Sequence, residues 1–170
     1  FPDYRVIIPG DGYKKIIIAV EKEKIKATLK RMSIISSENN RPVIFSCKGS
    51  HLEIYTEDSD LGNVKEKIEL KEKVKEEFKF CINCIYLLDI LNAVDEDIVI
   101  EYNAEEENKP IIVKPENKKE NVNYIVMPML MDWREKNGKY ELCFFDYNYY
   151  LFTVCLYSKQ KRKRKKAEYF

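Results

Sequence analysis

The sequence predicts an α+β domain of two successive β-α-β-β-β units, with both helices on one side of antiparallel sheet. Three observations support this fold class. The chain has 170 residues, which is enough for one domain with a buried core. Stretches with the apolar patterns of strands surround two stretches with helical apolar spacing. The same order of elements then occurs twice, which indicates two similar halves.

The first unit opens with an apolar strand at Lys15–Val20. The stretch from Glu21 to about Ile35 is predicted to be a helix, because Ile25, Leu29 and Met32 recur at intervals of four and three residues and form one apolar stripe. The three strands that complete the unit are Val43–Lys48 and His51–Thr56, joined at Gly49-Ser50, and then Val64–Leu70.

The second unit repeats this order. Its elements are a strand at Glu77–Ile82, a helix from Asn83 to about Val94, and strands at Ile98–Tyr102, Pro110–Val113 and Tyr124–Met129. Pro128 has no N–H to donate to a neighbouring strand. The last strand must therefore end at Pro128 or lie on the edge of a sheet.

The sequence Met127-Pro128-Met129 has two interpretations. Flexible thioether side chains beside a rigid proline form a plausible apolar wall for a peptide-binding groove. The alternative is that these residues close the last core strand and contact no partner. The spacing of apolar residues by itself favours the second interpretation.

Charge is unevenly distributed along the chain, although the formal net charge is only +1. Residues 132–170 contain ten Lys and Arg against five Asp and Glu, so the remainder carries a small acidic excess. A mildly acidic body is not typical of a protein that binds nucleic acid over its whole surface. Positive charge confined to one surface remains compatible with this composition.

Five cysteines, an odd number, together with no recognisable signal peptide, indicate a reducing, cytoplasmic location. Cys81 and Cys84 have the spacing of half a zinc site, but no second pair follows, and we predict small buried residues instead. The single histidine, His51, has no evident catalytic partner, and neither a phosphate-binding loop nor a dinucleotide motif is present. We therefore expect no enzyme activity, no cofactor, no metal and no membrane span.

The residues after Met131 differ in character from those before. Cys143–Tyr157 is rich in aromatic residues, and Lys159–Lys166 is almost entirely basic. This tail could be an interfacial anchor, a nucleic-acid-binding arm, an appended pair of strands, or residues from a shifted reading frame. We accordingly divide the chain into a domain at 1–131 and an atypical tail at 132–170.

Five short motifs follow one another along the chain: Phe1-Pro2-Asp3-Tyr4-Arg5, the segment Leu29–Glu38, Asn83-x-x-Tyr86-Leu87-Leu88-Asp89-x-Leu91, Lys109–Val113 and Met127-Pro128-Met129. Together they resemble the third, C-terminal domain of the bacterial sliding clamps, the β subunits of DNA polymerase III. The resemblance extends from Phe1 to about Met131. The chain begins with Phe rather than Met, and we expect it to be a fragment, a processed form or a partial gene model.

The resemblance implies a non-catalytic processivity factor that tethers the replicative polymerase and other partners to duplex DNA. The implied partners are duplex DNA, bound without sequence specificity by the ring, and polymerase and clamp-loader subunits, bound through short linear motifs. The full-length protein would be a homodimer. The implied peptide-groove residues are Pro2, Tyr4, Ile7, Asn83, Tyr86, Pro110, Ile125, Met127, Pro128, Met129 and Leu130.

Two further surfaces are implied. Lys26 and Lys30 would face DNA from the first helix, where diffuse phosphate contacts allow sliding. Ile34 and Ile35 correspond to an apolar pair at the family's subunit interface. The alternatives are that the lysines are simply solvated and that the isoleucines pack in this domain's own core. A different hypothesis for the whole chain is a nucleic-acid or membrane-surface protein that acts through Lys159–Lys166.

Overall fold

The computed structural model describes residues 14–36, 41–58, 62–103, 105–106, 109–117, 122–136, 139–145 and 154–157. At 57–58 and from residue 130 onward only the backbone is described. The first unit consists of β1 (Lys15–Val20), α1 (Lys22–Ile35), β2 (Pro42–Lys48), β3 (His51–Asp58) and β4 (Gly62–Glu69). The second consists of β5 (Phe78–Asn83), α2 (Cys84–Ala93), β6 (Ile98–Asn103), β7 (Ile111–Pro115) and β8 (Val122–Val126). Three strands follow: β9 (Leu130–Lys136), β10 (Lys139–Phe145) and β11 (Val154–Tyr157).

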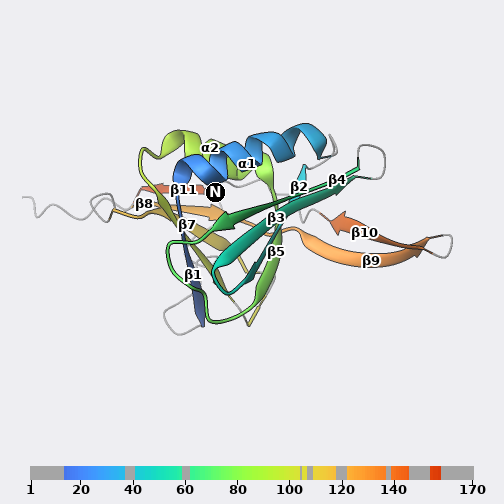
Figure 1. Cartoon of the computed structure of the whole chain (residues 1–170). Helices are drawn as coiled ribbons and strands as arrows, with labels where there is room; N and C mark the ends of the chain where they lie inside the picture. The colour runs from blue at the N-terminus through green and yellow to red at the C-terminus, as the bar shows by residue number, and fades with distance from the viewer. Residues whose placement is uncertain are drawn as a thin grey trace, which may run out of the picture.

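The predicted fold class is confirmed, and all ten elements predicted between residues 15 and 129 are present. Apart from the pair β9 and β10, the described strands form two antiparallel sheets, in the orders β4-β3-β2-β5 and β1-β6-β7-β8-β11. Both helices lie on the same side of these sheets and pack against each other (Figure 1).

The two units exchange their first strands. β1 belongs to the first unit, yet it pairs along its whole length with β6 of the second. β5 belongs to the second unit and pairs in the same way with β2 of the first. Neither unit therefore completes a sheet alone, and the domain forms as one body.

The main core lies between the helices and the inner faces of both sheets. Ile25, Leu29 and Met32, the predicted stripe of α1, are fully buried there. Where the sheets meet, a run of rings joins them: Phe80 stacks on Phe45 with centroids 5.0 Å apart and lies 5.1 Å from Tyr102 of the other sheet. These contacts link β2 and β5 to β6 by aromatic packing.

The N-terminus of α1 is capped from a distant part of the chain. The cap residue Glu21 makes no side-chain cap hydrogen bond, but the backbone N–H of Lys22 donates to Asp97 Oδ1 over 2.8 Å. Lys71 Nζ contacts the other oxygen of Asp97 at 2.7 Å and also pairs with Glu116. Through Asp97, the turn before β6 is joined to the start of α1 and to the loop after β4.

The prediction for the last strand of the second unit was wrong at its C-terminal end. β8 ends at Val126, not Met129, because Pro128 cannot donate a ladder hydrogen bond. The chain then crosses to the other sheet, where Met129 N–H donates to Cys81 O of β5 over 2.8 Å. The Met129 side chain packs with Ile44 and Cys81 in a second, smaller apolar cluster, which Tyr55 partly covers.

Part of the tail has regular backbone structure. β9 and β10 form an antiparallel hairpin that extends away from the two sheets (Figure 1), and β11 adds to the outer edge of β8. Of the alternatives drawn from the sequence, an appended set of strands agrees with this path. Lys159–Lys166 lies outside the described residues.

Replacing Asp97 by Ala should destabilise the protein by roughly 1 kcal/mol, the scale of a lost helix cap. Lys71 foremost, and then the Lys22 N–H, lower the pKa of Asp97. The carboxylate therefore contributes stability above its unfolded pKa of about 3.9, and this contribution is lost as the pH falls through the lower folded pKa. Urea unfolding of wild type and D97A should differ at about pH 6 and converge toward about pH 2 to 3.

Exposed Asp95 supplies the control for D97A. D95A should change the free energy of unfolding by no more than about 0.5 kcal/mol. An equal effect of D97A at both pH values would show that the carboxylate charge at Asp97 is not what stabilises α1.

Met129 and Met127 form a matched pair for testing how the chain packs where it crosses from β8 to β5. Met129 is 4% exposed and Met127 39%. M129A should lose about 2 to 5 kcal/mol of stability, because it opens a cavity in the small cluster, and M127A no more than about 0.5 kcal/mol. The shift in the denaturant midpoint, at an unchanged m-value, measures the loss of stability in each variant. Similar losses in the two variants would contradict the observed difference in burial.

Candidate peptide-binding and assembly surfaces

The segment Met127-Pro128-Met129 exposes only part of the predicted apolar wall. Met127 is exposed, Pro128 is buried, and Met129 is buried with Ile44 and Cys81. Since Met129 lies within its own cluster, Met127 is the thioether that a partner could contact without rearrangement of the domain. One exposed methionine next to a rigid proline remains compatible with the edge of a groove.

Asn83 and Tyr86 lie close to the point where this segment crosses to β5. Met129 is bridged to Cys81, two residues before Asn83 on the same strand. Asn83 is the N-cap of α2, and its Oδ1 accepts the backbone N–H of Ile85 over 2.9 Å. This bond fixes the orientation of the Asn83 side chain, whose amide NH₂ group can still donate to a peptide carbonyl. Tyr86 is half-buried against the main core.

The other predicted groove residues are buried or lie outside the described part of the chain. Ile125 is 3% exposed and pairs with Ile112 of β7, and Pro110 is also buried. Pro2, Tyr4 and Ile7 lie outside the described residues, as does the side chain of Leu130. Of the predicted groove residues whose side chains are described, Asn83, Tyr86 and Met127 are therefore the ones that are not buried.

The predicted DNA-facing lysines both lie on α1. Lys30 is exposed and Lys26 is half-buried. Arg31, which follows Lys30, is held differently: its guanidinium forms an ion pair with Glu66 of β4, and the Thr28 hydroxyl donates to the same carboxylate. This pairing lowers the pKa of Glu66, with the Arg31 hydrogen bond as the main cause. Arg31 therefore anchors α1 to β4, while Lys30 points to solvent.

The predicted subunit-interface residues lie at the C-terminal end of α1. Ile34 is 77% exposed and Ile35 is half-buried. Packing in the domain's own core, the alternative considered from the sequence, does not account for Ile34. α1 packs against β4, the outermost strand of its sheet. Among the described residues, an exposed isoleucine and a strand edge without a neighbouring strand thus lie at the same end of the domain.

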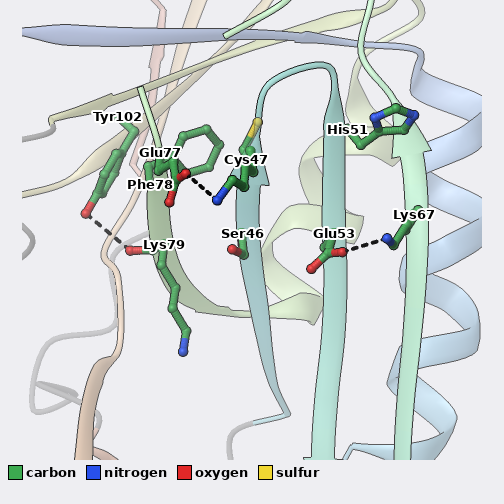
Figure 2. Close-up of a pocket in the computed structure, with 10 residues that line it drawn as sticks. Ser46, Cys47, His51, Glu53, Lys67, Glu77, Phe78, Lys79 and Tyr102 are labelled. Carbon is green, nitrogen blue, oxygen red and sulfur yellow. Dashed lines mark hydrogen bonds and ion pairs between the residues drawn. The ribbon is translucent and has the colours of Figure 1, made fainter. Parts of the chain in front are cut away.

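A hollow of about 680 Å³, which the sequence analysis did not anticipate, lies on the face of the four-stranded sheet away from the helices (Figure 2). Half of its lining residues are charged, namely Lys48, Glu53, Lys67, Glu77 and Lys79. Lys67 and Lys65 contact the two oxygens of Glu53 at 3.0 and 2.6 Å, and Lys48 pairs with Glu77 at 2.9 Å. In the sequence, the alternation of charged and apolar residues in β3 and β4 was the signal that one face of this sheet is exposed to solvent.

The chemistry of this hollow is that of a solvated sheet face. Hydrogen bonds from Lys65 and then Lys67 lower the pKa of Glu53, so this carboxylate is ionised and is not suited to act as a general acid near neutral pH. The ring nitrogen Nδ1 of His51 lies 3.0 Å from the Ser50 hydroxyl, its sequence neighbour. Among the described residues, no three His, Cys, Asp or Glu side chains are grouped to hold a metal ion.

The cysteines of the Cys81-x-x-Cys84 sequence are buried, as predicted. They lie in different clusters: Cys81 packs beside Met129, and Cys84 lies in the main core. Burial raises the pKa of the Cys84 thiol, which keeps it protonated and a poor nucleophile. In the described part of the chain, no helix has the length and apolar character needed to cross a membrane.

Comparison with known proteins gives one family. Residues 5–130 match the family described as "DNA polymerase III beta subunit, C-terminal domain". The beta sliding clamp of Rickettsia bellii is 32% identical over 139 residues, which cover 76% of this chain and 35% of that protein. The beta sliding clamp of Haemophilus influenzae is 30% identical over 129 residues, covering 76% and 34%. The chain thus spans about a third of the length of these relatives.

Solved structures share the fold. The DNA polymerase III beta subunit of Thermotoga maritima superposes with a TM-score of 0.69 at 24% identity, covering 78% of this chain and 35% of that one. The DNA polymerase sliding clamp of Bacillus subtilis gives a TM-score of 0.67 at 24% identity, covering 75% and 33%. The matched region contains both helices and every strand from β1 to β8. The chain therefore belongs to the family of the C-terminal domain of the DNA polymerase III beta subunit.

Proposed function

We propose that this chain is the C-terminal third of a sliding clamp, a processivity factor that tethers the replicative polymerase to duplex DNA. The observation that carries the proposal is the family match over residues 5–130. The relatives are named beta sliding clamps, and the family is named for a polymerase subunit. In this proposal the chain is a non-catalytic part of that subunit. We place it in the cytoplasm, a compartment that suits the thiols of Cys47 and Cys84.

The surface around Met127 is the proposed site for partner peptides. Short linear motifs bind through apolar anchors, with a few polar groups that fix the peptide backbone. Exposed Met127 offers the apolar contact, and the amide of Asn83 offers a donor near the same crossing. Polymerase subunits would bind here, and clamp-loader subunits would compete for the same residues.

The helices form the proposed DNA-facing side. Both lie on one side of the domain (Figure 1), and Lys30 and Lys26 are on α1. Contacts from a few lysines to phosphates are non-specific and weaken with salt, which suits a protein that moves along DNA. In this proposal Arg31 keeps its partner Glu66 and does not contact DNA.

Assembly is proposed to use the end of the domain where Ile34 is exposed beside β4. A second subunit would cover Ile34 and add a strand at the β4 edge, in a head-to-tail contact that closes a ring. Since the chain spans only about a third of its relatives, ring closure requires the remainder of the protein. In this proposal the homodimer is a property of the full-length protein.

The peptide site can be tested with a labelled peptide taken from the clamp-binding segment of a bacterial replicative polymerase. Met127→Ala should weaken binding by about tenfold or more, which corresponds to roughly 1.4 kcal/mol for an apolar anchor contact. Fluorescence anisotropy of the full chain measures the dissociation constant. The control is Ile17→Ala, which removes another exposed apolar side chain (58% exposed) on β1.

I17A should bind the peptide as tightly as wild type. Equal dissociation constants for M127A and wild type would remove Met127 from the site. Equal weakening by M127A and I17A would point to non-specific apolar adsorption in place of a groove.

A further inference from the structure

The face of the four-stranded sheet that lies away from the helices carries two ordered rows of residues next to Met129. The register of the strands fixes these rows, because residues opposite each other on neighbouring strands share one face. From β5 across β2 and β3 to β4, one row contains Cys81, Ile44, Tyr55 and Lys65, and the next contains Lys79, Ser46, Glu53 and Lys67. Met129 is bridged to Cys81, so the first row leads from the segment after β8 straight across the sheet.

These two rows are basic, although residues 1–131 as a whole carry a small acidic excess. The rows contain three lysines and one glutamate. Lys65 and Lys67 both contact Glu53, at 2.6 and 3.0 Å, so two ammonium groups share one carboxylate. The side chains of both lysines are more than half exposed. Among the described residues of the two rows, positive charge therefore exceeds negative charge at a solvent-facing position.

Tyr55 joins the basic part of this face to the apolar cluster around Met129. Its side chain packs against that cluster, and the Nζ atoms of Lys65 and Lys79 lie 5.7 and 5.8 Å from the centroid of its ring. Cations over an aromatic face are held in place near it. Apolar surface and positive charge are thus continuous from Met129 to Lys65.

The second row lines the hollow of about 680 Å³. The hollow lies where Ser46, a short side chain, stands between Lys79 and Glu53 of the neighbouring strands (Figure 2). A side chain from another molecule can enter such a depression, with lysine ammonium groups at its walls to pair with an anion.

We propose that this basic face binds an acidic segment of the same partner whose apolar anchor contacts Met127. The inference rests on the proposed peptide site and adds the chemistry of the partner: acidic residues beside the anchor. From the Met129 bridge to β4 the path crosses roughly four strand spacings of about 4.8 Å, which about six extended residues span. A peptide is the chosen occupant over nucleic acid, because the face adjoins the Met127 segment and lies opposite the helices, the proposed DNA side (Figure 1).

The test compares peptides that differ only in charge beside the anchor. The labelled polymerase peptide is extended on its N-terminal or its C-terminal side, with a run of glutamates or of glutamines centred about six residues from the anchor. In fluorescence anisotropy with the full chain at about 0.05 M salt, one of the two acidic peptides should bind roughly threefold to tenfold more tightly than its glutamine counterpart. This advantage should shrink at about 0.5 M salt, because salt screens exposed charges.

Three variants identify the surface involved. The double variant Lys65→Gln, Lys67→Gln should lose the advantage of the acidic peptide and bind the glutamine peptide as wild type does, which also shows that it folds. Met127→Ala should weaken both peptides by the same factor. The matched control Lys73→Gln, Lys75→Gln removes two exposed lysines from the loop after β4, and it should keep the full advantage.

Equal binding of acidic and glutamine peptides by wild type would overturn the proposal, as would an advantage that survives in K65Q/K67Q. Equal losses in K65Q/K67Q and K73Q/K75Q would reduce the effect to net charge. If K65Q/K67Q binds both peptides like wild type but binds duplex DNA more weakly, the face belongs to nucleic acid.

The two proposals fail in different ways. Binding of the acidic peptide that M127A leaves unchanged and K65Q/K67Q abolishes would contradict the Met127 site and keep the basic face. Binding that M127A weakens for every peptide, with no preference for acidic ones, would keep the Met127 site and remove the basic face.

Discussion

The exchange of first strands between the two units is the constraint on which the rest of this structure depends. β1 completes the sheet of the second unit, and β5 completes the sheet of the first, each through six residue pairs. Because both pairings join residues far apart in sequence, each sheet forms only when the other unit is present. The helices then cover one side of a surface to which both units contribute, and the aromatic rings of Phe80 and Tyr102 fill the junction between the sheets.

The position of the proposed peptide site follows from this exchange. β5 is brought beside β2, and its free edge receives Met129 as the chain leaves β8. The same strand ends at Asn83, whose side chain caps α2. Met127 thus comes near Asn83 because both are tied to β5, one through the Met129 bridge and the other directly. The proposed peptide site therefore depends on the contact that the segment after β8 makes with β5.

Electrostatic contacts in the described chain hold elements together and do not build a reactive centre. Asp97 joins the start of α1 to the loop after β4, and Arg31 joins α1 to β4 through Glu66. In each case an acidic side chain with a lowered pKa forms an ion pair with a basic side chain: Asp97 with Lys71, and Glu66 with Arg31. This arrangement suits a binding module, since such pairs stay ionised near neutral pH and fix positions, whereas acid–base catalysis needs a group that changes protonation there.

The sequence by itself determined the elements of this protein and their order. Apolar spacing placed α1 and its buried residues Ile25, Leu29 and Met32, and the alternation in β4 marked a half-exposed strand. These features depend on neighbours within a few positions, and the sequence contains that information directly. The family motifs singled out Met127 and Ile34 as candidate contact residues, which periodicity could not distinguish from core residues.

Only the tertiary structure decided which strands pair, that Met129 is buried while Met127 is exposed, and that Asp97 caps a helix 75 residues away in sequence. It also decided that β11 adds to β8. Each of these depends on contacts between distant segments. A strand's own residues specify its pattern of burial but not the identity of its neighbour, because backbone hydrogen bonds are the same for every partner.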